Sequence, residues 1–142
     1  MTSSGYTVDQ ANQFLQTNFA PWVLDLKPVV TSVNDGSIQL EIPPNPALYR
    51  VGRIVCGQAL MALADTAMVL GLVSALEESR LVTTVDMNTT LMRPVADDVV
   101  IAKTEVSRLG RTMAFMRVVM NARQTGKPVS HATGTYAVLP GS

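Results

Sequence analysis

The sequence predicts one α+β domain in which a long central helix is wrapped by a curved antiparallel sheet of five to six strands. Three observations support this prediction. Residues 57–76 are almost continuously apolar, the segments around them have the residue pattern of strands, and 142 residues are the length of one domain. A short amphipathic helix and a hairpin precede the long helix, and four strands follow it. We therefore expect a single domain over residues 1–142.

The N-terminal part is predicted to form a helix over about residues 8–18 and a β-hairpin over residues 29–42. Thr7 is suited to cap the helix, and Gln10 stands three residues later, as in a capping box. In the second half of the hairpin every other residue is apolar, and an Asp-Gly pair at 35–36 supplies a two-residue turn. These features place both elements before the central helix.

The central helix is expected over about residues 57–78. A helix that is apolar nearly all round must be buried on nearly every side. The stretch is also long enough to cross a bilayer. However, Asp65 lies near its middle, where a carboxylate costs about 2.5–3.5 kcal/mol on insertion scales, and no other segment forms a second span. We expect a core helix in a soluble protein that has no membrane partner.

Four segments after the helix have strand character and match its length. The helix spans about 33 Å at 1.5 Å per residue, and strands of 10–12 residues at about 3.3 Å each reach a similar length. One sheet cannot enclose a helix completely, so the open side predicts a second copy of the chain. A homodimer is the simplest arrangement. The four expected strands are 82–91, 99–109, 112–122 and 129–139.

Composition excludes several classes of function. The chain has eleven basic and eleven acidic residues and a formal net charge of zero, which argues against a nucleic-acid partner. One cysteine and one histidine allow neither an internal disulfide nor a Cys/His zinc site. Charged residues make up only 15%, below the roughly 25% of soluble domains, which favours a surface covered by another subunit. Because the N-terminus lacks the pattern of a signal peptide, we expect a cytoplasmic protein.

The segment Cys56–Ala67 resembles the signature of the phenylacetic-acid-degradation-type (PaaI-like) acyl-CoA thioesterases, which usually reads His-Gly-Gly, six residues, then Asp. Residues 85–88, 93–94, 110–112 and 132–136 are also similar to that family, so the resemblance covers about residues 30–140. It implies the hotdog fold, hydrolysis of an acyl-CoA thioester without a cofactor or metal, and a homodimer that pairs into a tetramer.

Asp65 and Gly57 are the candidate catalytic residues. A lone carboxylate in an apolar helix is too costly to keep without a partner or a role, and the resemblance makes Asp65 the nucleophile or general base. The alternative is an acid that accepts hydrogen bonds from the amides of a nearby loop. Gly57 begins the helix, where its N–H is suited to polarise the thioester carbonyl. The alternative there is an ordinary glycine at a tight helix start.

The spacing of these two residues predicts a shared site. Gly57 and Asp65 are eight residues apart, which is about 12 Å along one helix axis. They are therefore too far apart to touch one carbonyl group from the same subunit. If two central helices run antiparallel across a dimer interface, Gly57 of one chain faces Asp65 of the other. The dimer would then have two active sites.

Four further residues are candidate substrate-binding residues: Gln58, Thr84, Arg93 and Arg111. Gln58 lies seven residues before Asp65, on nearly the same helix face, and is suited to orient the carboxylate, a water or the thioester. Thr84 lies near the position where family members often hold a hydroxyl that places the water. The two arginines are suited to bind the phosphates of coenzyme A. The alternatives are a solvent-facing glutamine, a plain strand threonine and solvated arginines.

Two departures from the family signature keep other functions open. Cys56 replaces the histidine, and Gln58 replaces the second glycine. A non-catalytic acyl-CoA-binding hotdog protein is therefore the second hypothesis. A different hotdog enzyme, such as a hydratase, is the third, although no histidine accompanies Asp65 in the helix. Cys56 with His131, the only histidine, is a further possible nucleophile–base pair, and an inert packed thiol is the alternative.

Overall fold

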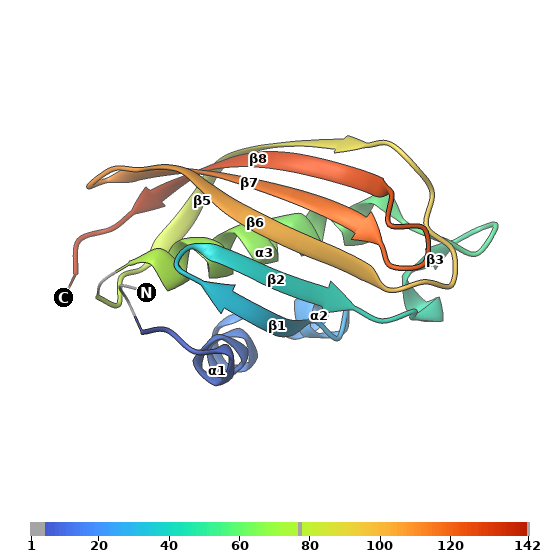
Figure 1. Ribbon diagram of the computed structural model, residues 1–142, viewed down its shortest axis with the longest axis horizontal. Helices are drawn as coiled ribbons and strands as arrows, with labels where there is room; N and C mark the ends of the chain where they lie inside the picture. Colours follow the sequence, from blue (N-terminus) through green and yellow to red (C-terminus); the bar gives the residue numbers. More distant parts are fainter. Residues whose placement is uncertain (1–4, 77, 142) are drawn as a thin grey trace.

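The structure is a computed structural model that describes residues 5–76 and 78–141. Within these residues a long helix, α3 (Gly57–Ala75), lies against one six-stranded antiparallel sheet (Figure 1). This arrangement confirms the predicted α+β fold class, including the number of strands. In order across the sheet, the strands are β1 (Val29–Asn34), β2 (Ser37–Ile42), β6 (Val100–Leu109), β7 (Met113–Ala122), β8 (Pro128–Val138) and β5 (Val82–Leu91).

The N-terminal elements form as their sequence predicts. Helix α1 (Val8–Asn18) begins with a capping box, in which the Gln10 N–H donates to Thr7 Oγ1 over 3.1 Å and the Thr7 N–H donates to Gln10 Oε1 over 2.8 Å. The turn between β1 and β2 places Asp35 at φ 46° and Gly36 at φ 88°. Both values lie in the left-handed region that a two-residue hairpin turn requires.

The central helix ends earlier than predicted. The sequence favoured a helix to about residue 78, but α3 ends at Ala75, and Leu76 is already extended with φ −79° and ψ 137°. Two glutamates follow at 77 and 78, and negative charge at the C-terminal end of a helix opposes the helix dipole. Residue 77 itself lies outside the described residues.

Four short elements were not predicted from the sequence. Each has two to four residues, too few to show a periodic pattern of apolar residues. They connect α1 to the sheet and the sheet to the start of α3. These elements are α2 (Pro21–Leu24), the 3₁₀ helix η1 (Pro46–Leu48), β3 (Tyr49–Arg50) and β4 (Ile54–Val55).

The core lies between α3 and the inner face of the sheet. Leu63, Met68 and Leu70 of the helix are completely buried against inward side chains such as Leu40 and Met120. Within the described residues, α3 is the one helix long and apolar enough to cross a membrane, and most of it is buried inside the fold. This burial is what the prediction of a core helix requires.

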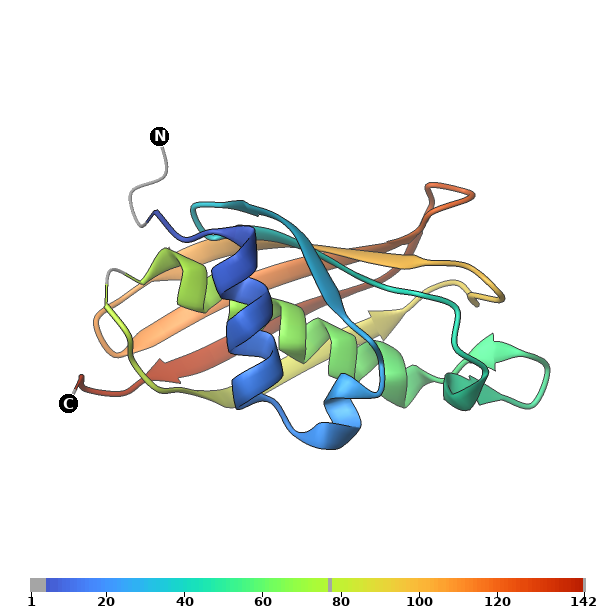
Figure 2. The same ribbon diagram turned by 90° about the horizontal axis from the view of Figure 1, so that it is seen from below.

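One side of α3 is nevertheless open. Gln58, Met61, Asp65 and Val69 follow one another at steps of three or four residues, and all four are at least partly exposed. Met61 is the most open apolar member, at 45% exposure. In Figure 2, α1 crosses the C-terminal half of α3 and does not reach the half that begins at Gly57. We call these four residues the open stripe of α3.

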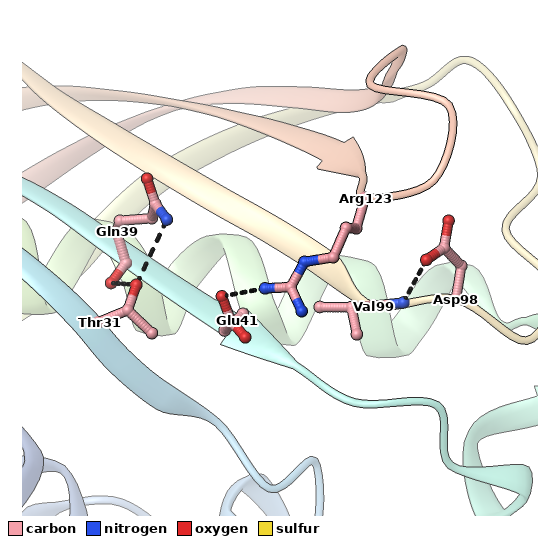
Figure 3. A network of polar contacts seen from close by, with 6 residues as sticks. All are labelled: Thr31, Gln39, Glu41, Asp98, Val99 and Arg123. Atoms are coloured by element: carbon pink, nitrogen blue, oxygen red, sulfur yellow. Dashed lines mark hydrogen bonds and ion pairs between the residues drawn. The ribbon is translucent and has the colours of Figure 1, made fainter.

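Polar contacts hold the opposite edge of the sheet together (Figure 3). Arg123, which follows β7, reaches past β6 to Glu41 on β2, with 2.6 Å between guanidinium and carboxylate. Asp98 accepts hydrogen bonds from the N–H groups of Val99 and Gln124 and so fixes the loop before β6. A half-exposed ion pair contributes little to stability. These contacts therefore position strands rather than form a reaction site.

Candidate functional site

Asp65 is held by two hydroxyl groups that reach it from the sheet. Thr84 on β5 donates to Asp65 Oδ1 over 3.0 Å, and Tyr136 on β8 donates to the same oxygen over 2.8 Å. Among the described residues no donor reaches Oδ2. The carboxylate is half-buried on the open stripe of α3. It is thus fixed through one oxygen, while the other is left for an incoming group.

Tyr136 is the member of the site that sequence analysis did not identify. It is fully buried, and its ring lies over Gly134, where an added Cβ would stand 2.8 Å from Tyr136 Cε1. Burial, followed by the charge and hydrogen bond of Asp65, raises the pKa of the Tyr136 phenol far above its ordinary value. The hydroxyl therefore stays protonated and remains a donor. Side-chain chemistry could have pointed to Tyr136. A buried tyrosine hydroxyl needs a polar partner, and Asp65 is the acid of the core helix.

A β-bulge in β5 lets this strand serve both ends of the site. Thr84 lies opposite Tyr136, but the next pair is Asp86 with Thr135, so Val85 is an extra residue. Before the bulge, Thr84 faces the same side of the sheet as α3. After the bulge, the odd-numbered residues from Met87 to Leu91 face that side. Side chains that are seven residues apart on a regular strand would face opposite sides.

Gly57 opens α3 at the far end of β5. An added Cβ there would stand 2.8 Å from Leu91 Cδ1, so the inward leucine packs directly on the glycine. The preceding residue, Cys56, makes no capping hydrogen bond with its side chain. The first-turn N–H groups have no acceptor within a helix. Among the described residues the Gly57 N–H makes no hydrogen bond, so it can donate to a ligand at the positive end of the helix dipole.

Comparison with known proteins identifies the family. The sequence pattern of the Thioesterase superfamily matches residues 53–129, which is more than half of the chain and includes both Gly57 and Asp65. The chain belongs to the thioesterase superfamily. A protein of Thermoplasma acidophilum with a provisional esterase name is 32% identical over 114 residues, which is 77% of this chain and 81% of that protein.

Solved structures show the same fold for this thioesterase-superfamily chain. The Escherichia coli PaaI protein from the phenylacetic acid degradation operon has a TM-score of 0.83 at 18% identity and covers 95% of each chain. A hypothetical thioesterase from Streptococcus pneumoniae, solved with coenzyme A, has a TM-score of 0.73 at 23% identity and covers 79% of this chain and 85% of its own. The expected hotdog fold of the PaaI-like type is confirmed.

The remaining candidate substrate-binding residues, Gln58, Arg93 and Arg111, are only partly brought together. Gln58 is exposed on the open stripe, beside Asp65 in helical phase, and within the described residues it makes no hydrogen bond to the carboxylate. Arg93 borders a cavity of about 280 Å³ that also contains Gly57 and Arg50, and its Nη1 donates to the carbonyl of Pro128 over 2.6 Å.

Arg111 lies at the opposite end of the molecule from Arg93. It borders a groove of about 840 Å³ at the C-terminal end of α3, together with Arg80 and Arg108. The two ends of α3 are about 27 Å apart by its length. Within one subunit, Arg93 and Arg111 therefore cannot bind the same phosphate group. The sequence does not reveal this separation. Arg93 follows the end of β5 and Arg111 follows the end of β6, and only the folded sheet shows that these strand ends lie on opposite sides of the molecule.

Cys56 and His131 do not form a nucleophile–base pair in this fold. The backbone N–H of Cys56 donates to the carbonyl of Leu48 over 2.9 Å at the start of α3. His131 is exposed on β8 between two buried neighbours, so its side chain points to the outer face of the sheet. The sheet separates the two side chains. In the described part of the chain, no group of three or more His, Cys, Asp or Glu is placed to hold a metal ion.

Proposed function

We propose that the protein is an acyl-CoA thioesterase that hydrolyses an acyl-CoA to a carboxylate and free coenzyme A. The observation that carries this proposal is the hydrogen bonding of Asp65. Its Oδ1 accepts from Thr84 and Tyr136, and within the described residues no donor reaches its Oδ2. Family membership and the coenzyme A bound to the Streptococcus pneumoniae neighbour support the substrate class. Tyr136 and Thr84 are positioning residues, because they act through the carboxylate.

Two routes use the free oxygen of Asp65. As a general base, Oδ2 takes a proton from water, and the water oxygen attacks the thioester carbonyl. The C–S bond then breaks, and the coenzyme A thiolate takes up the proton. As a nucleophile, Oδ2 attacks the carbonyl itself, the thiolate leaves, and water hydrolyses the resulting acyl anhydride. Both routes place negative charge on the carbonyl oxygen, which a backbone N–H at a helix N-terminus stabilises.

The Gly57 N–H that meets this oxygen belongs to a second subunit in our proposal. Eight helical residues separate Gly57 from Asp65, about 12 Å along α3. In an antiparallel pair of α3 helices, Gly57 of each chain faces Asp65 of the other, and Met61, midway between them, faces its own copy. Met61 is an exposed apolar residue of the open stripe. A residue that contacts its own copy across a two-fold axis would be exposed in this way in a single chain.

The edge of the sheet supports the same interface. β5 is an edge strand next to α3, and it exposes Val85 at 58% and Leu91 at 49%. An edge strand with unpaired backbone groups and exposed apolar side chains is suited to pair with another strand. Pairing two β5 strands brings the two open stripes together on one side of a continuous sheet. The family resemblance also implies a tetramer of two such dimers, which analytical ultracentrifugation measures directly.

The same dimer brings the separated arginines to one end. Past Gly57 of one subunit, the partner's α3 continues for about 15 Å beyond its own Asp65. The groove with Arg108 and Arg111 lies at that end of α3, and Arg93 of the first subunit lies next to Gly57. We therefore propose that arginines from both subunits bind the coenzyme A phosphates. The reaction would take place in the cytoplasm.

The decisive experiment measures thiol release across a panel of acyl-CoA esters. Wild type should release thiol, and Asp65→Asn, which keeps the shape of the side chain, should lose at least a hundredfold in kcat. The altered residues Cys56 and Gln58 favour the second candidate, a non-catalytic acyl-CoA-binding protein. If both chains bind acyl-CoA without releasing thiol, that candidate is correct. A hydratase would instead convert enoyl-CoA without releasing thiol.

A further inference from the structure

We infer that a cavity between α1, α3 and the start of β5 receives the acyl group and makes the enzyme selective for apolar acyl chains. This inference rests on the proposed thioesterase function. The cavity has a volume of about 400 Å³, near the lower end of the roughly 300–1,000 Å³ of small-molecule sites. That volume fits one acyl group rather than a whole coenzyme A ester. In Figure 2 the three elements converge where the lower end of α1 meets α3 and the chain that enters β5.

The cavity lies beside Asp65. Val69 forms part of its wall, one helical turn after Asp65 and about 6 Å along the axis. Helical side chains lean toward the N-terminus of their helix, so Val69 leans toward the turn that carries Asp65. Val82, another wall residue, is two residues before Thr84 and faces the same side of β5. An acyl chain attached to a carbonyl at Asp65 can therefore enter this cavity directly.

The lining of the cavity is mainly apolar. Phe14 and Phe19 of the α1 region form an edge-to-face pair with ring centroids 6.2 Å apart. The polar wall residue Arg80 already donates through Nε to the carbonyl of Leu139 over 2.8 Å, and the Asn18 amide donates to the carbonyl of Phe14 over 3.0 Å. Asn18 and Arg80 thus bond to the backbone, Ser79 is the remaining polar wall residue, and most of the wall offers an acyl chain hydrophobic contact.

Part of this wall is built outside the segment that identifies the family. The matched pattern covers residues 53–129, whereas Phe14 and Phe19 come from the N-terminal region. Asp65 and Gly57, which act on the thioester, lie inside the matched segment. The two residues that act on the thioester thus come from the matched segment, whereas Phe14, Asn18 and Phe19 of the wall, like the positioning residue Tyr136, come from outside it.

The test measures kcat/KM for straight-chain acyl-CoA esters from acetyl to decanoyl by thiol release. Each methylene that enters the cavity should raise kcat/KM by about fourfold, the equivalent of about 0.8 kcal/mol, until the cavity is full. Val69→Phe fills the entrance and should abolish this increase. Leu81→Ala, at a wall residue that is 66% exposed, should weaken it without disturbing the fold.

Phe19→Ala enlarges the cavity and should move the preferred acyl length upward. Phe115→Ala is the matched control, since Phe115 is an exposed residue of β7 and should leave the profile unchanged. If rates do not rise with acyl length, or if Val69→Phe keeps the rise, the inference is wrong and the thioesterase function stands. If no acyl-CoA ester releases thiol, the proposed function fails, and the inference fails with it.

Discussion

Thr84 and Tyr136 lie directly opposite each other on β5 and β8, and both donate to the same oxygen of Asp65. Opposite residues of an antiparallel pair point to the same face of the sheet, so the two hydroxyls approach the acid as a unit. The sheet thus fixes the orientation of a carboxylate that a helix carries. Within the described part of the chain, its other oxygen accepts no hydrogen bond.

Replacing the Tyr136 hydroxyl should lower turnover. Tyr136→Phe removes a hydrogen bond to a charged group, worth about 1.5–3 kcal/mol, which corresponds to a loss of about 10- to 100-fold in kcat. KM should change little, because the hydroxyl acts through Asp65. Thr84→Val tests the second donor, and the double variant should lose less than the product of the single effects. A Tyr136→Phe enzyme with full kcat would contradict the positioning role.

The shifted pKa of Tyr136 predicts a dependence of stability on alkaline pH. Burial first, and then Asp65, raise this pKa, so the folded protein keeps a proton that the unfolded chain loses near pH 10. The contribution is fully present below about pH 10 and falls above it, by up to about 1.4 kcal/mol per pH unit. Urea unfolding from pH 8 to 11 should show a shallower decline for Tyr136→Phe. Equal slopes for the two chains would refute the prediction.

The contact between Gly57 and Leu91 predicts a rescue. Gly57→Ala keeps the backbone N–H but places a methyl group against Leu91 Cδ1, where an unmoved Cβ would be only 2.8 Å away. The end of the Leu91 side chain must then move and change the surroundings of the Gly57 N–H, so kcat should fall. Gly57→Ala combined with Leu91→Ala should recover most of the activity, with Leu91→Ala alone as the control. No recovery in the double variant would mean that the glycine is needed for another reason.

Charge at the centre of the open stripe should separate the subunits. Met61→Lys places two like charges face to face on the proposed two-fold axis, so the chain should run as a monomer in size-exclusion chromatography. Its circular dichroism should be unchanged, and thiol release should disappear. Val29→Lys is the control, because Val29 is half-exposed on β1 at the opposite edge of the sheet. A folded Met61→Lys monomer with full activity would disprove the shared site.

The sequence predicted the elements whose signal is local and periodic. The strand at 82–91 has the predicted bounds, and the N-terminal helix has its predicted capping box. The lone acid in an apolar helix made Asp65 the candidate catalytic residue, and that role stays a prediction. Tyr136 was missed because it is 71 residues from Asp65 along the chain, and no spacing rule relates α3 to β8. The separation of Arg93 from Arg111 is likewise set only by the assembled sheet.

The extra residue at Val85 has a consequence for comparing this chain with its relatives. Counting alternate positions along β5 from Thr84 would place Asp86 and Asn88 on the inner face of the sheet, whereas Met87 and Leu91 face that side. Deleting one residue from this strand would swing either the hydroxyl away from the acid or the leucine away from the glycine. A functional alignment must therefore preserve the residue count between these two contacts, even where the residues themselves differ.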